Sequence, residues 1–131
     1  MTRQAVTTDG APKPVVPYSQ AISVDGFVFC SGQVGLDPAT GTLADGIEAQ
    51  TERVMRNLAA VLDSAGLAFA DVVKTTILLT DMNDFAIVNG IYAKFVGDPP
   101  PARATFAVVG LPRSASVEIE AIARRATSGG G

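Results

Sequence analysis

The stretch "DVVKTTILLTDMNDFAIVNGIYAKFVGD", residues 71–98, changes its pattern halfway along. Its first part is β-branched and apolar, a composition typical of a strand, and we expect a strand over residues 71–80. The second part has apolar side chains at helical spacing and reaches Gly97, a residue type that commonly ends helices. Gly90 weakens this helix by about 1 kcal/mol relative to Ala. Its apolar face is predicted to hold Phe85, Val88, Tyr92 and Phe95, with Asn83 or Asp84 as the cap.

A longer helix is predicted on the N-terminal side, over residues 46–65. Asp45 followed by Glu48 resembles a capping pattern, and Gly66 supplies a C-terminal stop. The apolar residues of this segment recur every three or four positions and form one stripe, which comprises Ile47, Val54, Leu58, Val61, Leu62 and Ala65.

Strands are predicted at both ends of the chain. Two short β runs flank Asp25-Gly26, a strong hairpin signal. Near the C-terminus, "ARATFAVVG" and "ASVEIEAIARR" are separated by a turn around Leu111-Pro112, and we expect them to pair antiparallel. In a strict hairpin Arg103 lies nearer Arg124 than Glu118. Arg103 and Glu118 then meet only if the strands are not simple neighbours or if subunits associate.

The order β-β-α-β-α-β-β predicts one α+β domain over residues 1–131, with a mixed sheet and two helices packed on one face. Residues 1–14 and 127–131 are expected to be loose termini. A sheet covered on one face leaves its other face unpaired, and only 18% of the residues are charged. Both features favour burial of that open face against another copy of the chain.

The composition narrows the possible chemistry. The chain has no His and one Cys, Cys30, which excludes Ser-His-Asp and Cys-His catalysis, His-based metal sites and a disulfide framework. A net charge of −3 with scattered basic residues argues against nucleic acid as a partner. No apolar run is long enough to span a membrane, and we expect a cytoplasmic protein. Chemistry must come from carboxylates, hydroxyls, Arg, Lys and backbone groups.

Several polar residues have both an ordinary and a functional interpretation. Arg103 follows three prolines and is either a solvated surface residue or a bidentate clamp for a carboxylate. Alternation along the last strand places Glu118 and Glu120 on one face, which is either solvated or available for acid–base chemistry. The local sequence alone favours ordinary packing or turn roles for Tyr18, Ser31, Asn89 and Cys30.

The order of segments shifts this balance. The stretches "PYSQA", "SGQVGLDPATG", "NLAAVLDSAGL", "PPARATFAV" and "VEIEAIA" resemble the reactive intermediate deaminase family, RidA, also called endoribonuclease L-PSP. The resemblance covers residues 17 to about 125. It implies a chorismate-mutase-like α+β fold, homotrimers, and sites in clefts between subunits. It also implies hydrolysis of reactive enamines and imines to 2-oxo acids and ammonia, without metal or organic cofactor.

The resemblance assigns roles residue by residue. It implies that Arg103 binds the substrate carboxylate and that Glu118 handles the hydrolytic water. Thr105 stands where many members carry a cysteine, which affects the expected rate and substrate preference. The remaining substrate-binding positions implied by the family motifs are Tyr18, Ser31, Gly32 and Asn89.

The expected substrates are 2-iminobutanoate and 2-iminopropanoate. A non-catalytic trimer that binds small carboxylates is the alternative, which Thr105 leaves open. The family name also suggests a ribonuclease or translation inhibitor, but the acidic pI of about 4.7 and the absence of His argue against it.

Overall fold

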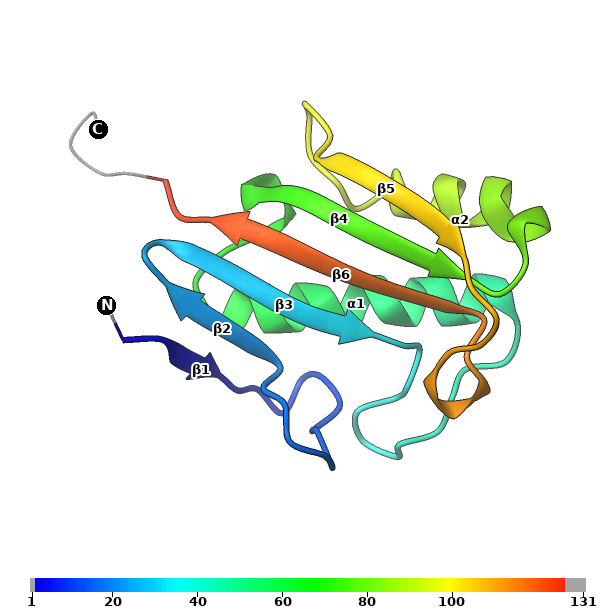
Figure 1. Cartoon of the computed structure of the whole chain (residues 1–131), viewed down its shortest axis with the longest axis horizontal. Coiled ribbons are helices and arrows are strands. Elements are labelled where there is room, and N and C mark those ends of the chain that lie inside the picture. The colour runs from blue at the N-terminus through cyan, green and yellow to red at the C-terminus, as the bar shows by residue number, and fades with distance from the viewer. Residues whose placement is uncertain (1, 127–131) are drawn as a thin grey trace.

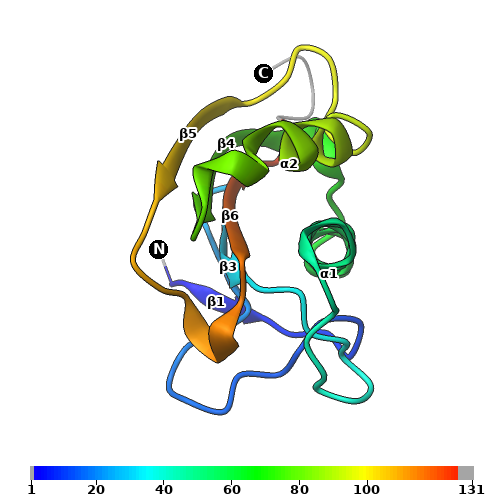
Figure 2. The same ribbon diagram turned by 90° about the vertical axis from the view of Figure 1, so that its right-hand side faces the viewer.

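The computed structural model describes residues 2–126, in which six strands form one mixed sheet of order β1-β2-β3-β6-β4-β5. Both helices cover the same face of this sheet, as Figure 2 shows most clearly, and the predicted α+β architecture is confirmed. The expectation for residues 127–131 lies outside the described residues. The elements in Figure 1 are β1 (Gln4–Val6), β2 (Ala21–Val24), β3 (Phe27–Gln33), α1 (Ile47–Ser64), β4 (Val72–Leu79), α2 (Phe85–Tyr92), β5 (Ala102–Ala107) and β6 (Val117–Arg124).

The predicted hairpin is β2–β3. Val24 pairs with Phe27, and the two residues between them have positive φ angles, 53° at Asp25 and 83° at Gly26. This is the geometry of a type I′ turn, whose twist matches that of the flanking strands.

The expectation of a loose N-terminal segment was wrong for residues 4–12, and residue 1 lies outside the described residues. Gln4–Val6 pairs antiparallel with β2 and forms one edge of the sheet, and Ala11 is buried. With three residues, β1 is too short to show a strand pattern in the sequence. Its order comes from pairing with β2, and the residues that follow it are held by the buried side chain of Gln20.

Helix α1 packs its apolar stripe on the sheet as predicted. Its start differs from the expectation, because the residue before the helix is Gly46, with φ 87°, and no side chain caps it. Asp45 lies one residue too early to act as the cap. Gly66, with φ 78°, follows the helix end as expected. The fully buried residues of the stripe are Val54, Leu58, Val61 and Leu62, and Met55, which was not predicted, is fully buried beside them.

Helix α2 is shorter than expected and ends at Tyr92. It is preceded by a turn of 3₁₀ helix over Met82–Asp84, and the cap of this turn is the Asp81 carboxylate, which accepts from Asn83 N at 2.9 Å. Asp84 occupies the N-cap position of α2, as one of the two predicted alternatives, but its side chain makes no capping hydrogen bond. Within the described residues, no helix combines the length and apolar character needed to cross a membrane.

The expected pairing of β5 with β6 was also wrong. β5 pairs parallel with β4, and β6 lies between β3 and β4, antiparallel to both. The connection through α2 returns the chain to the end of the sheet where β4 began, so β5 must run parallel to β4. The prolines Pro99–Pro101 cannot donate backbone hydrogen bonds, which suits the start of an edge strand.

Strand β6 separates the two faces of the sheet as predicted. Val117, Ile119, Ala121 and Ala123 are buried beneath the helices, and Glu118 and Glu120 lie on the opposite face. We call this second face the open face, because neither helix covers it. Large apolar side chains are exposed there, including Phe29 at 43% and Phe106 at 55%.

Candidate functional site

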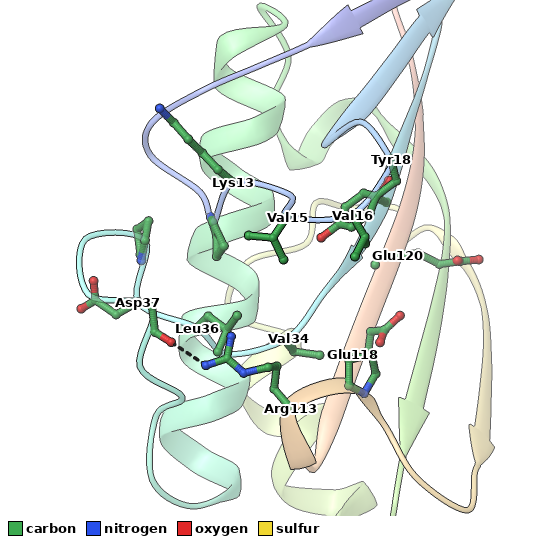
Figure 3. A pocket seen from close by; sticks show the side chains of 16 residues that line it. Lys13, Val15, Val16, Tyr18, Val34, Leu36, Asp37, Arg113, Glu118 and Glu120 are labelled. Carbon is green, nitrogen blue, oxygen red and sulfur yellow. Dashed lines mark hydrogen bonds between the residues drawn. The ribbon is translucent and has the colours of Figure 1, made fainter.

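A cavity of about 700 Å³ lies on the open face, at the start of β6. We call it the Glu118 pocket (Figure 3). Three chain segments form its walls: the loop before β2, the end of β3 with the loop that follows, and the turn before β6. The lining includes Tyr18, Ser31, Gly32, Val34, Arg113 and Glu118.

A bulge in β3 shapes the centre of this pocket. Cys30 pairs with Ala121 and Gln33 pairs with Ile119, so two residues of β3, Ser31 and Gly32, oppose one residue of β6. Such bulges redirect side chains and occur often beside active sites. Here the bulge brings the backbone of Gly32 against Glu118.

The fit between Gly32 and Glu118 is close. A Cβ atom at position 32 would lie 2.8 Å from Glu118 Cδ and would overlap one carboxylate oxygen. Only glycine therefore allows the Glu118 carboxyl group to occupy this position.

The environment of Glu118 changes its acidity. Burial raises the pKa of Glu118 above its ordinary value, and the neighbouring charge of Glu120 raises it further. In Figure 3 the Glu120 carboxylate points away from that of Glu118. A raised pKa moves a carboxyl group in the direction that favours general acid–base catalysis.

Ser31 connects the bulge to the segment that carries Tyr18. Its hydroxyl donates to the Ser19 carbonyl at 2.6 Å, and its backbone N–H donates to the Gln20 carbonyl at 3.0 Å. The hydroxyl proton is therefore committed to the protein, while the oxygen can still accept a hydrogen bond. Tyr18, half exposed, lies beside it in the pocket wall.

The buried residue Gln20 was not predicted from the sequence. The two N–H groups of its side-chain amide are shared among the carbonyls of Thr8, Ala11 and Pro12 at 3.0, 3.2 and 3.0 Å, and its carbonyl accepts from Thr8 N at 2.7 Å. These four bonds fix the segment that leads into the pocket wall at Val15. A glutamine beside a strand carries no sequence signal for such a role.

Polar side chains of α1 and the turn before β6 hold the remaining walls. Asn57 Nδ2 donates to the carbonyls of Val34 and Leu36 at 3.3 and 3.0 Å. Arg113 Nη2 donates to the Gly41 carbonyl at 3.0 Å, the dashed line in Figure 3. These bonds fix the loop after β3 from both sides.

The other predicted residues form a second group, the Arg103 cluster, which comprises Arg103, Asn89 and Thr105. Arg103 Nη1 donates to Asn89 Oδ1 at 2.7 Å, joining β5 to α2. Thr105 follows on the same face of β5. Its hydroxyl oxygen is buried and has no hydrogen-bond partner among the described residues.

The sheet separates the two groups. Arg103 pairs with Thr75, which pairs with Ala121, so all three side chains belong to the helix-covered face. Glu118 pairs with Leu78 on the open face. Arg103 and Glu118 of one chain therefore lie on opposite faces of the sheet. The residues of the Glu118 pocket lie together, as do those of the Arg103 cluster, but the pocket and the cluster do not meet within one chain.

The fold and these two groups define a small α+β protein. A pocket lined by the Glu118 carboxyl group lies on one face of its sheet, and an exposed arginine lies on the edge strand. A family model described as endoribonuclease L-PSP matches residues 8–125. The chain belongs to this family, and the resemblance to the RidA proteins is confirmed.

Relatives of known name agree with this assignment. Protein DfrA of Myxococcus xanthus is 53% identical and covers 94% of this chain and 96% of its own length. The 2-iminobutanoate/2-iminopropanoate deaminase of Mus musculus is 48% identical over 92% of this chain and 90% of its own.

Solved structures share the fold. RidA from the Antarctic bacterium Psychrobacter has a TM-score of 0.90 at 44% identity, with coverage of 92% of this chain and 98% of its own. TdcF of E. coli, solved with bound serine, has a TM-score of 0.90 at 34% identity, with coverage of 94% and 99%.

Proposed function

We propose that this protein hydrolyses 2-imino acids, 2-iminobutanoate and 2-iminopropanoate among them, to 2-oxo acids and ammonia in the cytoplasm. The observation that carries the proposal is the acid–base carboxyl of Glu118 in a pocket, together with an exposed guanidinium at Arg103. Relatives named as deaminases of these imino acids, at 48% identity in the mouse, support the substrate class.

The active site forms between chains of a homotrimer. Because Arg103 and Glu118 of one chain lie on opposite faces of the sheet, a single small substrate reaches both only when they come from different chains. The exposed apolar side chains of the open face, such as Phe106, are a suitable surface for that association.

Arg103 binds the substrate carboxylate. A guanidinium presents paired N–H groups that match the two carboxylate oxygens. One N–H group of Arg103 Nη1 is donated to Asn89 Oδ1 on the protein side. Asn89 thus acts by holding Arg103. Thr105 lies two residues further along the same face of β5, and its buried hydroxyl, which is without a partner in the described chain, borders the carboxylate site from within.

Glu118 of the adjacent chain activates water. The water oxygen forms a bond to the imine carbon while its proton passes to Glu118, which protonates the imine nitrogen. Glu118 then accepts the proton of the new hydroxyl group and transfers it to the amine. The C–N bond breaks, and ammonia and the 2-oxo acid leave. One positioned carboxyl accelerates such a step by about 10²–10⁴-fold.

Tyr18, Ser31 and Gly32 complete the pocket around the reacting carbon. The Ser31 oxygen accepts from the substrate nitrogen or water, since its own proton is donated to the Ser19 carbonyl. The pocket does not suit RNA, because two acidic residues in its lining, Glu118 and Glu120, repel a phosphate backbone.

The test generates the imino acid in situ with an amino-acid oxidase and traps the remaining imine with semicarbazide. We expect the wild-type protein to suppress semicarbazone formation and Arg103→Ala to lose this effect. Failure of a well-folded protein to suppress it would contradict the deaminase activity. Tight binding of 2-oxobutanoate in that case would indicate a carboxylate-binding trimer.

A mixing experiment tests the shared site. Arg103→Ala and Glu118→Gln, each inactive alone, are unfolded, mixed in equal amounts and refolded together. In randomly mixed trimers about a quarter of the sites then have both residues intact, if each site draws on two chains. No recovery of activity in verified mixed trimers would contradict the shared site.

A further inference from the structure

The guanidinium of Arg103 lies against one face of helix α2. The residues on that face are Phe85, Asn89 and Tyr92, spaced four and three positions apart, so their side chains project in the same direction. Arg103 Cζ is 5.6 Å from the centroid of the Phe85 ring and 5.3 Å from that of Tyr92. With Asn89 at 2.7 Å, the three side chains surround the guanidinium on the protein side.

The Tyr92 ring is fixed by a buried hydrogen bond. Its hydroxyl and that of Thr75 are 2.7 Å apart, and both residues are buried. Thr75 is also the residue that pairs with Arg103 in the sheet. The strand pair that positions the arginine backbone therefore also anchors the ring that contacts its side chain.

We infer that Phe85 and Tyr92 are positioning residues for Arg103. By holding the guanidinium in place, the two rings set the affinity of Arg103 for a carboxylate ligand. Aromatic faces attract a cation within about 6 Å of their centroid. The rings restrain a side chain that is otherwise among the most flexible in proteins, so less freedom is lost when the ligand binds.

The carboxylate as ligand rests on the proposed function, but the restraint on Arg103 does not. The guanidinium is exposed on the side away from α2, so its remaining N–H groups stay accessible to a carboxylate while Nη1 is bound to Asn89. Phe85 and Tyr92 do not touch the substrate in this arrangement and act through Arg103 alone.

The test compares Phe85→Leu and Tyr92→Leu with the conservative variants Phe85→Tyr and Tyr92→Phe. Phe95→Leu is the matched control: this ring also lies near an arginine, 6.0 Å from Arg56 Cζ, and packs on Phe69, with centroids 5.9 Å apart. All proteins are first checked for their melting temperature and oligomeric state, so that general loss of packing is measured separately.

We expect Phe85→Leu and Tyr92→Leu to raise the dissociation constant of 2-oxobutanoate, measured by calorimetry, by about three- to tenfold. KM should rise by the same factor with kcat nearly unchanged, because the carboxylate is bound equally in the ground and transition states. Phe85→Tyr should bind like wild type, and Phe95→Leu should do so even if its melting temperature falls. Tyr92→Phe, which keeps the ring and loses the Thr75 bond, should be intermediate.

A second measurement needs no ligand. The order parameter of the Arg103 Nε–H bond, from ¹⁵N relaxation, should fall in Phe85→Leu and stay unchanged in Phe95→Leu. Equal mobility of Arg103 in wild type and Phe85→Leu would overturn the inference, as would equal weakening of binding by Phe85→Leu and Phe95→Leu. A wild-type protein that binds 2-oxobutanoate without hydrolysing imines would refute the deaminase proposal and leave the role of the rings intact.

Discussion

The carboxyl group of Glu118 lies directly against the Cα atom of Gly32, on the bulge of β3. Gly32→Ala should therefore displace this carboxyl while keeping the fold, because the end of a glutamate side chain can rotate away. We expect kcat to fall at least tenfold, a fraction of the 10²–10⁴-fold typical of one acid–base group. Steady-state kinetics with thermal melts measure the two effects.

The matching control is the double variant Gly32→Ala with Glu118→Ala. Removal of the glutamate side chain should abolish the stability cost of the added methyl group, since the two groups no longer compete for space. Additive losses of stability in the double variant would show that the strain at position 32 has another source.

Arg103→Lys should keep the fold and lose most of the activity. Lysine preserves the charge but loses the paired N–H groups that match a carboxylate. A charge-assisted hydrogen bond contributes about 1.5–3 kcal/mol, so kcat/KM should fall roughly 10- to 100-fold. Near wild-type kcat/KM in this variant would refute the role of Arg103.

Glu118→Gln should change the pH dependence of stability as well as activity. The pKa of Glu118 is raised in the folded protein by burial first and by Glu120 second. At pH values below the pKa that Glu118 has in the unfolded chain, the carboxyl group is protonated in both states and does not lower the free energy of unfolding. As pH rises from there toward the folded pKa, the group ionises in the unfolded chain first, and the folded state loses stability.

The variant should consequently melt at a higher temperature than wild type near pH 7, with the difference shrinking toward about pH 4. Thermal melts across this range measure the difference. A difference that is constant with pH, or that grows toward acid, would contradict the raised pKa. Glu120→Gln provides the companion measurement: it should move the acidic limb of the kcat/KM profile to lower pH.

Gln20→Leu should destabilise the protein and loosen one wall of the pocket. The substitution leaves the buried carbonyl of Ala11 without this partner, along with the partly buried backbone groups of Thr8 and Pro12, at about 1–3 kcal/mol for each group that water cannot reach. Hydrogen exchange should increase over residues 8–13 before it increases in β3 or β6. Uniform faster exchange across the sheet would mean that Gln20 supports the whole core instead.

Local patterns in the sequence were enough for much of the fold. The Asp25-Gly26 turn, the apolar stripe of α1 and the alternation around Glu118 each follow from neighbouring residues alone. The pairing of β5 depended on where α2 returns the chain, which spacing does not encode. The turn predicted between β5 and β6 favoured a hairpin of these two strands. In the structure β4 lies between them and pairs with both.

The candidate site was predictable only through family resemblance. Arg103 and Glu118 each have an ordinary interpretation in isolation, and their separation by the sheet emerged only with the strand order. The sequence does not indicate the roles of Gln20 and Tyr92. In the sequence a glutamine before a strand resembles any other polar residue, and a tyrosine on a helix resembles any other packing residue. Their roles depend on partners far along the chain, Thr8 for one and Thr75 for the other.

The wall of the Glu118 pocket at Val15 and Val16 has an evolutionary consequence. Gln20 anchors the preceding segment, and the wall residues themselves take no part in the pairing of the sheet. Their side chains, exposed by 95% and 59%, can therefore be exchanged without disturbing a strand or a helix. Gene duplicates built on this scaffold can diversify at these two positions while keeping the contact between Gly32 and Glu118.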